Sequence, residues 1–312
     1  MKRLRGIGVQ LVIFFIIAIS IPTFMLAIDV VVTTKSTQRS NMQLTSEQTL
    51  QETKKGFETY LKTLSQPIDL LTRKNEVKHL EDQGTIDDNV KAIQDSLCAS
   101  VKVTSGAKRA FFTTKTGYKI TGWVEPNPAN GKTTNKKTVV TNANDTSKVW
   151  YKNSIGLAAR NNIYAYMSDP YKDSETGDTI FTVSQEIKYT NNENYGVVGM
   201  DIDFSEVTEY VQNIGLLNTG YVLLVDSNGQ VIVDNERNTY CSGSVTSLGF
   251  WDKLNSYKGS ENEYGINIFS EKINGENVEV IATKDEVTGW TLVGFISSKE
   301  TSATTNKMIS NT

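Results

Sequence analysis

The sequence has little of what most enzymes use for their chemistry. It contains a single histidine among 312 residues, His79, which is set among charged neighbours at an expected helix end. A Ser-His-Asp or Cys-His catalytic system would depend on that one residue. The motifs HExxH, GxSxG, GxxxxGK[ST] and GxGxxG are all absent. We therefore predict that the protein is not an enzyme, and we assign it no cofactor and no metal.

Cysteine and basic charge are also scarce. The two cysteines, Cys98 and Cys241, lie far apart and form no CxxC pair, so the sequence offers neither a zinc site nor a dithiol redox motif. They are either small buried residues or, in an oxidising compartment, partners in a disulfide. The net charge of −3 and the pI near 5.5 argue against nucleic-acid binding, which needs a basic surplus on one face.

What the chain does have is a long apolar run at its start. Lys2, Arg3 and Arg5 precede an uncharged segment from Gly6 to Ile28, which as a helix would reach about 33 Å and span a bilayer. Cleaved signal peptides have a shorter apolar region and small residues at the cleavage site, so we expect a retained anchor. The positive-inside rule places the basic N-terminus in the cytoplasm, the anchor in the cell membrane and residues after about 29 on the extracellular side.

A long stalk helix is expected over residues 29–80, where Gly56 and Pro67 are the few helix breakers. Apolar residues in its second half recur in steps of four and three, which is a heptad seam that packs on its own domain or on a second copy. These residues are Phe57, Leu61, Leu64, Ile68 and Leu71. Pro67 should kink the helix and mark where the stalk joins a globular body. Anchor and stalk together predict a homodimer in the membrane.

Strand patterns dominate the rest of the chain. A short helix is expected over 87–101 and a polar loop over 132–145. Another helix begins at Ser205, with acidic residues in its first turn. A hairpin turns at Ser227-Asn228-Gly229, and a short helix follows over 250–257. The other expected strands are 109–114, 118–124, 163–167, 179–187, 195–204, 263–269, 276–283 and 290–297.

These elements predict an α+β fold in which a long N-terminal helix is followed by two antiparallel-sheet modules in tandem. We divide the chain into six parts. They are a cytoplasmic N-terminus with its membrane anchor (1–28), a stalk helix (29–80), a membrane-distal module that binds the ligand (81–204), a linker helix (205–219), a membrane-proximal module (220–298) and a juxtamembrane tail before a second span (299–312).

One short stretch, "DTSKVWYKNS", places two large aromatics beside a cation within a polar region. Lys148, Trp150 and Tyr151 could line a pocket for a small ligand that carries a carboxylate. The alternative is that Trp150 and Tyr151 only fill a core where the amphipathic helix "WYKNSIGLAA" begins. The sequence leaves both interpretations open.

With an anchor, a long helix and two sheet modules, the chain resembles the extracellular double-Cache (dCache) sensor domains of bacterial methyl-accepting chemotaxis proteins and sensor kinases. The resemblance covers about residues 30–298 and includes the closing "GWTLVGFIS", Gly289 to Ser297. It implies two PAS-like modules and a receptor for signal transduction. Amino-acid-binding members of this family carry a basic residue, one spacer and Trp-Tyr, then Tyr-x-Asp, then Gly-x-Asp in a strand.

The three elements stand here as Lys148-Val149-Trp150-Tyr151, Tyr171-Lys172-Asp173 and Gly199-Met200-Asp201. The family more often has Arg at the first position; a lysine ammonium pairs with a carboxylate as a point charge but lacks the bidentate fork. Tyr166 competes with Tyr171 for the second element. Tyr118 matches a further pocket tyrosine.

The chemistry of an α-amino acid fits this set, because its pocket needs opposite charges on opposite walls of a partly apolar cleft. Lys148 and the Trp150 indole N–H would serve the ligand carboxylate. Asp173 and Asp201 would take its ammonium, or that of a related amine, and the tyrosine faces would add cation–π attraction.

The resemblance implies the extracellular ligand-binding sensor domain of a transmembrane chemoreceptor, with chemotaxis as the commonest output. The alternatives are the sensor module of a histidine kinase or of a diguanylate cyclase, because the downstream signalling partners are not encoded in this sequence. The identity of the ligand also stays open. A different class of function is an anchored extracellular hydrolase that uses Asp173 and Asp201 as acid and base. The lack of histidine and of any nucleophile motif favours the sensor.

Overall fold

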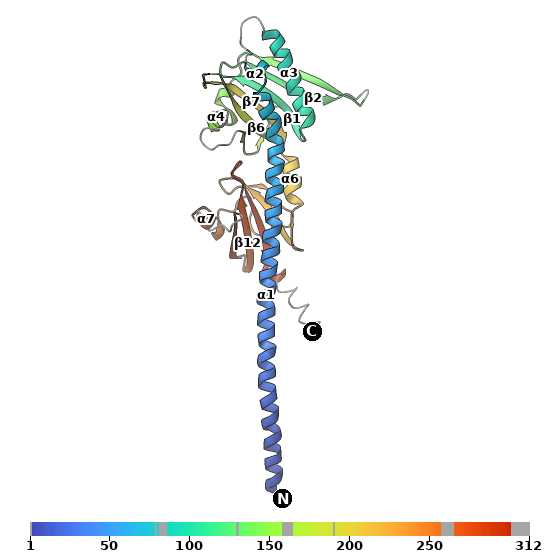
Figure 1. The fold of residues 1–312 in the computed structure, drawn as a ribbon, viewed down its shortest axis with the longest axis vertical. Coiled ribbons are helices and arrows are strands. Elements are labelled where there is room, and N and C mark those ends of the chain that lie inside the picture. Colours follow the sequence, from blue (N-terminus) through green and yellow to red (C-terminus); the bar gives the residue numbers. More distant parts are fainter. Residues whose placement is uncertain are drawn as a thin grey trace.

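The computed structural model describes residues 2–78, 80, 86–128, 131–157, 165–189, 191–256 and 265–300. His79 lies outside these ranges. Two modules are stacked along one side of a single long helix, α1 (Lys2–Thr72), whose N-terminal part extends beyond them as a bare stem (Figure 1). The expected α+β class is confirmed.

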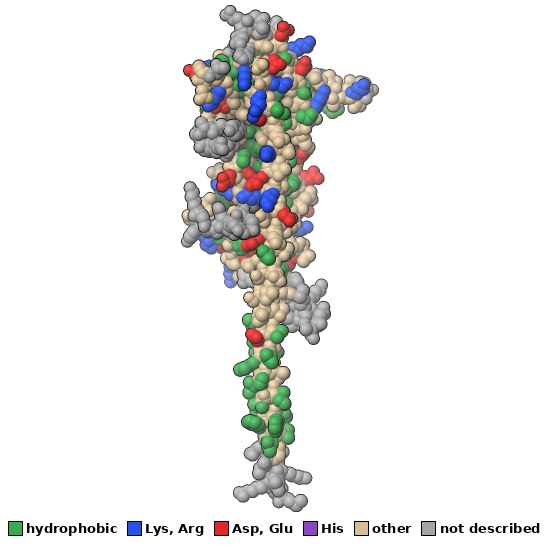
Figure 2. All heavy atoms as spheres, viewed as in Figure 1, with side chains coloured by type: hydrophobic (Ala, Val, Ile, Leu, Met, Phe, Trp, Pro, Cys, Tyr) green, Lys and Arg blue, Asp and Glu red, His purple; other side chains and the backbone are tan. Residues whose placement is uncertain are grey.

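The stem of α1 carries the apolar run. Its hydrophobic side chains form a belt on all visible sides of the stem (Figure 2), and residues such as Phe14, Phe15 and Leu26 are more than half exposed. By length and composition, α1 from Leu11 onward is the one helix in the described ranges that could cross a membrane. The expected boundary between anchor and stalk, at residues 28–29, lies within α1, which is continuous there.

The heptad seam of α1 faces the protein's own body. All five of its residues are at most 2% exposed, in one core with the sheets of both modules. Of the two alternatives, packing on its own domain is therefore the one observed. The helix ends at Thr72, earlier than expected, and a turn at Arg73 and Lys74 leads to the short helix α2 (Asn75–Lys78).

Pro67 does not mark the junction of stalk and body, so that expectation was wrong. The helix continues past Pro67 to Thr72, and contact with the body begins well before it. Gln43 donates a hydrogen bond to Glu279 at 3.3 Å, and Leu50 is fully buried. A proline costs one backbone hydrogen bond, and the buried seam on both sides of Pro67 holds the helix together.

The membrane-distal module is a seven-stranded antiparallel sheet in the order β3-β2-β1-β7-β6-β4, with β5 also paired to β6. Helices α1 and α3 (Ile86–Val103) cover one face, and the short helix α4 (Val149–Ser154) lies on the other. A 3-10 turn, η1 (Asp145–Ser147), precedes α4. The strands are β1 (Ala107–Thr114), β2 (Lys119–Pro126), β3 (Thr133–Val140), β4 (Tyr166–Met167), β5 (Tyr171–Lys172), β6 (Thr179–Lys188) and β7 (Asn194–Asp203).

Strand β3 replaces most of the polar loop that we expected over residues 132–145. Its residues pair with β2 from Lys119↔Val140 to Pro126↔Thr133, and seven of the eight are exposed. With both faces in water, the strand needs no alternation of apolar and polar residues, which is the signal that identifies a half-buried strand. Backbone pairing and ion pairs from Lys136 to Glu125 and from Lys137 to Asp95 hold it instead.

The membrane-proximal module follows helix α6 (Ser205–Gln212) and has six antiparallel strands in the order β10-β9-β13-β12-β11, with β8 paired to β9. The expected hairpin is confirmed, because Asp226 accepts hydrogen bonds from the backbone N–H groups of Asn228 and Gln230, both at 2.8 Å. The elements are β8 (Gly215–Leu216), β9 (Gly220–Val225), β10 (Val231–Val233), α7 (Gly249–Ser256), β11 (Ile266–Ile273), β12 (Glu276–Lys284) and β13 (Thr291–Ser297).

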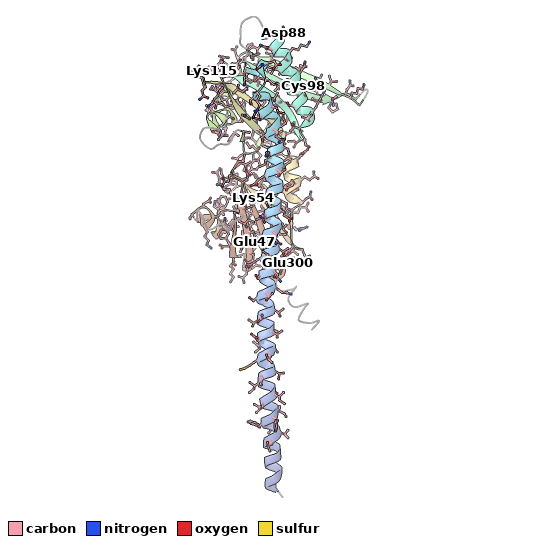
Figure 3. The ribbon with its side chains drawn as sticks, viewed as in Figure 1. Glu47, Lys54, Asp88, Cys98, Lys115 and Glu300 are labelled. Atoms are coloured by element: carbon pink, nitrogen blue, oxygen red, sulfur yellow. The ribbon has the colours of Figure 1, made fainter. Side chains whose placement is uncertain are left out.

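Two features fix the ends of this module. Trp290 is fully buried between the modules, with its ring near those of Phe57, Phe181 and Phe204. At the opposite end Glu300 (Figure 3) accepts hydrogen bonds from the backbone N–H groups of Asn218 and Thr219 at 2.7 and 3.2 Å. Trp290 therefore joins the proximal module to the distal one, and Glu300 ties the segment after β13 to the turn before β9.

The cysteines form no disulfide. Cys98 is buried in α3 (Figure 3), whereas Cys241 is partly exposed in the proximal module. Because the two lie in different modules, the alternative of two unpaired, small residues is the one the structure shows.

Candidate functional site

The candidate site lies on the face of the distal sheet that α1 and α3 do not cover. Alternation along β1 puts Arg109 and Phe111 on this face, and the strand register places them opposite Asp201 and Gly199 of β7. On the next strand, Thr182 of β6 is paired with Asp201. Three adjacent strands therefore bring one basic, one acidic and one hydroxyl side chain together.

Arg109 is the centre of a cluster of carboxylates. Its Nε lies 2.7 Å from Asp201 Oδ2, one terminal nitrogen lies 2.9 Å from Asp173 Oδ1, and the other lies 2.7 Å from Glu175 Oε2. Asp173 and Asp201 are buried, and the Arg109 side chain is 22% exposed. The structure thus brings the two predicted aspartates together, around a cation that sequence reasoning did not select.

The remaining contacts of Asp201 come from β6 and β5. Thr182 Oγ1 donates to Asp201 Oδ1 at 2.8 Å, and the Tyr171 hydroxyl lies 2.6 Å from Thr182 Oγ1. The Tyr171 hydroxyl is also at the long distance of 3.5 Å from Asp201. Tyr166, the competing choice, accepts a hydrogen bond from Asn153 near α4 instead. Of the two tyrosines, Tyr171 is the one next to the acidic cluster.

Burial and pairing shift the acidities of this cluster in opposite directions. Burial raises the pKa of Asp201 above its usual value, against the lowering effect of Arg109 and Thr182. Burial also tends to raise the pKa of Asp173, but hydrogen bonds from Arg109 and Thr176 outweigh it and the net pKa is lowered. Desolvation likewise raises the pKa of the Tyr171 hydroxyl, which stays neutral.

Trp150 and Tyr151 form an aromatic cluster beside Arg109. Both are buried in α4, where they pack with Phe111 and Val197, and the rings of Trp150 and Phe111 are 4.8 Å apart between centroids. Tyr151 donates to Asn194 at 3.2 Å, and burial raises its pKa to about 12. Core packing of Trp150 and Tyr151 is therefore observed, and a ligand pocket beside them stays a prediction.

Glycine at position 199 is required by this aromatic cluster. A Cβ atom built on Gly199 would lie 2.4 Å from the Phe111 ring. The glycine of the Gly-x-Asp element therefore lets the ring lie directly over the β7 backbone.

Lys148 is exposed, and its side chain pairs with no acidic group in the described ranges. Another lysine lies deeper: Lys119 Nζ is 2.8 Å from Asp145 and 4.8 Å from the centroid of the Phe111 ring. Sequence reasoning missed Lys119, although its position one residue before the buried Ile120 of β2 places it on the site face.

Tyr118 is the predicted residue that the structure does not bring to this face. It packs against the large core beneath α1 and α3. The physical reason is alternation, because Tyr118 is two residues from Ile120, which belongs to that core. Within the described ranges, no group of three histidine, cysteine or acidic side chains is placed to hold a metal ion.

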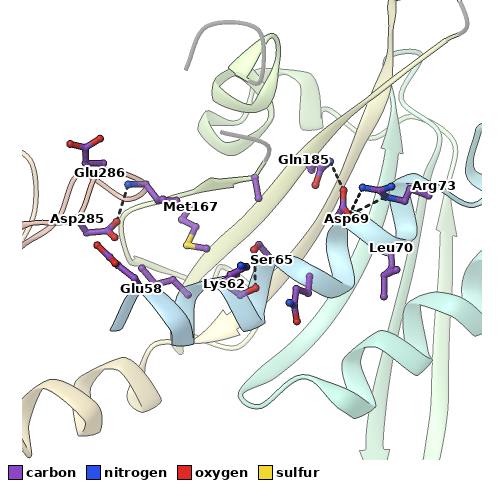
Figure 4. Close-up of a pocket in the computed structure, with 14 residues that line it drawn as sticks. Glu58, Lys62, Ser65, Asp69, Leu70, Arg73, Met167, Gln185, Asp285 and Glu286 are labelled. Carbon is purple, nitrogen blue, oxygen red and sulfur yellow. Dashed lines mark hydrogen bonds and ion pairs between the residues drawn. The ribbon is translucent and has the colours of Figure 1, made fainter. Parts of the chain in front are cut away.

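A concavity of about 750 Å³ lies between α1 and both modules (Figure 4). In it Gln185 donates to Asp69 at 3.4 Å, and Asp69 also pairs with Arg73 at 2.9 Å. The turn at Asp285 and Glu286 forms the wall on the proximal side. The lining includes none of the seven predicted site residues, so this cavity is separate from the cluster around Arg109.

Comparisons with known proteins agree with this architecture. Residues 32–305 match the family model described as "Cache domain". A probable methyl-accepting chemotaxis protein of Bacillus thuringiensis is 25% identical over 157 residues, and the methyl-accepting chemotaxis protein TlpB of Bacillus subtilis is 25% identical over 149. These matches cover 50% and 48% of this chain but only 21% and 20% of the relatives.

Among solved structures, the sensory domain of the Campylobacter jejuni chemoreceptor Tlp3 with isoleucine bound superposes with a TM-score of 0.59 at 18% identity. It covers 86% of this chain and 98% of that domain. The ligand-binding domain of the Pseudomonas fluorescens chemoreceptor CtaA in complex with L-isoleucine gives 0.53 at 17% identity, covering 86% and 99%. At these identities the likeness establishes the fold.

Proposed function

The chain belongs to the Cache domain family, and on that premise we propose that it is the extracellular ligand-binding sensor domain of a bacterial transmembrane chemoreceptor. The ligand is an amino acid or a related amine that binds in the membrane-distal module. The observation that carries this proposal is the convergence of Asp173 and Asp201 on one cation, next to the aromatic cluster of Trp150 and Tyr151.

The chemistry of the ligand follows from the two neighbouring clusters. Two buried carboxylates with a hydroxyl donor beside them form a subsite for a cation that donates several hydrogen bonds, and an α-ammonium has three such donors. Phe111 and Trp150 provide an apolar wall for a side chain. That the Tlp3 and CtaA domains hold isoleucine supports an amino acid as the ligand class here.

The ligand carboxylate needs a positive partner. Lys148 stands before Trp150 as in the family motif, and Lys119 lies over the Phe111 ring on the site face. We assign the carboxylate to Lys148 together with the Trp150 indole N–H, and Lys119 is the rival partner that the structure adds.

The setting of the domain is part of the same proposal. The apolar stem of α1 anchors the protein in the cell membrane, residues after about 29 are extracellular, and two copies associate there. The methyl-accepting chemotaxis relatives favour chemotaxis over a kinase or cyclase output. A hydrolase that uses Asp173 and Asp201 as acid and base is disfavoured, because Arg109 bridges both carboxylates.

Binding without turnover tests the function. The protein in detergent micelles is screened by thermal shift against the twenty amino acids and common amines, and hits are measured by calorimetry. Asp201→Ala should abolish binding, because the ligand ammonium loses a buried partner at a cost of roughly 2 to 5 kcal/mol. Asp178→Ala, at an exposed carboxylate that pairs with Lys108, is the matched control. No hit in the screen, or an Asp201→Ala affinity within about threefold of wild type, a change smaller than 1 kcal/mol, would overturn the proposal.

A further inference from the structure

The proposed ammonium subsite is already occupied by the protein's own side chains. Asp201 accepts from Arg109 at one oxygen and from Thr182 at the other. Asp173 accepts from Arg109 at one oxygen and from Thr176 at the other, at 2.9 Å in both cases. Each carboxylate oxygen therefore has an internal donor, and a ligand ammonium needs one of those donors to leave.

Arg109 is the donor that can leave. Thr182 has a short side chain, lies in the middle of β6 and is fully buried. Thr176 belongs to the same tight turn as Asp173, whose backbone carbonyl accepts a hydrogen bond from the Gly177 N–H. Arg109 has a long side chain, and its third contact, Glu175, is 75% exposed at the outer edge of the cluster. A rotation of the guanidinium toward Glu175 would free both aspartates and keep one ion pair.

We propose that Arg109 is a specificity-determining residue, a tethered cation that fills the ammonium subsite and moves toward Glu175 when a ligand ammonium enters. This proposal rests on the proposed function, since it concerns the ligand of the same site. A group attached to the protein competes at an effective concentration in the millimolar range, which weakens the binding of any free cation. A simple amine then competes poorly, whereas an amino acid adds contacts through its carboxylate and side chain.

The contacts of the two aspartates favour a ligand ammonium that replaces the Arg109 guanidinium over one that binds beside it. With Arg109 in place, Asp173 and Asp201 share one guanidinium, and each of their four oxygens already accepts a hydrogen bond. A second cation added beside the guanidinium would meet like-charge repulsion, whereas exchange keeps the number of buried charges unchanged.

Two variants and one control separate the possibilities. Arg109→Ala removes the tethered cation, and Arg109→Lys keeps the charge but loses the fork that reaches several carboxylates at once. Lys108→Ala is the control, because Lys108 is the neighbouring residue of β1 and pairs with other carboxylates, Asp178 and Asp203. The first readout uses methylguanidinium and methylammonium and needs no natural ligand.

In the full chain, Arg109→Ala should unfold at a lower temperature than wild type, and millimolar methylguanidinium should restore part of that loss. Neither wild type nor Lys108→Ala should respond. If Arg109→Ala does not fold, the same cation titration is run on Arg109→Gln, which also lacks the tethered charge and should respond in the same direction, whereas Arg109→Lys keeps a tethered cation and should respond less. Absence of any stabilisation by methylguanidinium in the variant that folds overturns the proposal, whatever ligand the wild type binds.

The second readout is amino-acid affinity at mildly alkaline pH, because the pKa of Asp201 is raised and a higher pH favours its ionised form. Arg109→Ala should bind the ligand found in the screen at least about tenfold tighter than wild type, because the internal competitor is gone. Binding that weakens instead would show that Arg109 itself holds the ligand, and would overturn exchange. If methylguanidinium stabilises Arg109→Ala but no amino acid binds any form, the cation subsite stands and the proposed amino-acid function fails.

Discussion

The indole N–H of Trp290 donates a hydrogen bond to Asp169 at 2.8 Å, and this contact joins the two modules. Trp290 precedes β13 of the proximal sheet, whereas Asp169 belongs to the distal module, two residues before Tyr171 and four before Asp173. The segment that carries two candidate site residues is therefore tied directly to Trp290, which is buried between the two modules.

We predict that Trp290→Phe weakens this tie without removing the aromatic packing around it. The lost hydrogen bond should lower the free energy of unfolding by about 0.5–1.5 kcal/mol, measured by denaturant unfolding. Ligand-induced protection of β13 amides in hydrogen exchange should decrease. The matched control is Trp123→Phe, because Trp123 donates its indole N–H to Glu125 at the exposed surface. Unchanged protection of β13 in Trp290→Phe would show that ligand binding reaches the proximal sheet by another route.

A lysine series at two positions distinguishes the two candidate partners of the ligand carboxylate. If Lys148 is the partner, Lys148→Arg should bind as well as wild type or better and Lys148→Glu should not bind, because Arg adds a second parallel hydrogen bond and Glu repels the carboxylate. Calorimetry at constant ionic strength is the measurement. Lys119→Met is the matched test of the rival; a loss of affinity there, with equal affinities for all Lys148 variants, would transfer the role to Lys119.

Gly199→Ala should destabilise the distal module, since the added methyl group meets the Phe111 ring at 2.4 Å. Overpacking of this kind typically costs about 1–3 kcal/mol, which thermal or denaturant unfolding would detect. Phe111→Leu in the same chain should recover part of the loss by opening space. Gly215→Ala serves as the control, because a Cβ atom at Gly215 meets no atom within 4 Å. Equal stability of the Gly199 and Gly215 variants would mean that the ring moves aside freely.

Amino-acid affinity should decrease as the pH falls, and the decrease should begin above the ordinary carboxyl pKa of 3.8. The sign follows from Asp201, which must be ionised to pair with an ammonium and whose pKa is raised by burial. Asp173 has a lowered pKa and keeps its charge through the same range. Calorimetric titrations from neutral to acidic pH measure this. An affinity that stays constant down to pH 3.8 would remove Asp201 from the binding step.

Much of the architecture could be predicted because burial leaves a periodic pattern. The seam from Phe57 to Leu71 and the hairpin at Asn228-Gly229 both appeared as expected. Strand β3 could not be recognised, since a strand with two solvated faces shows no such periodicity. Pro67 did not mark the junction of stalk and body, because the packing of α1 on both modules outweighs the loss of one backbone hydrogen bond.

The site could be predicted in part. The resemblance to amino-acid-binding dCache domains selected Asp173 and Asp201, which the structure places around one guanidinium. Arg109 and Lys119 were missed because they belong to no motif, and only the register of β1 with its neighbours places them on the site face. Alternation could have excluded Tyr118, because it shares the parity of the buried Ile120. Strand parity is therefore the signal that would have improved the prediction.

The solvated strand β3 also affects whether protein molecules associate with one another through the edge of the distal sheet. It is the terminal strand of the distal sheet, and its outer edge presents backbone donors and acceptors on which another chain could add a strand. Its side chains are Thr, Asn and Lys followed by the exposed Val139 and Val140, and the charges of Lys136 and Lys137 lie near its middle. Desolvating those ammonium groups opposes the stacking of one sheet on another. The same polar and charged composition that concealed β3 as a strand thus disfavours the addition of another strand at this edge.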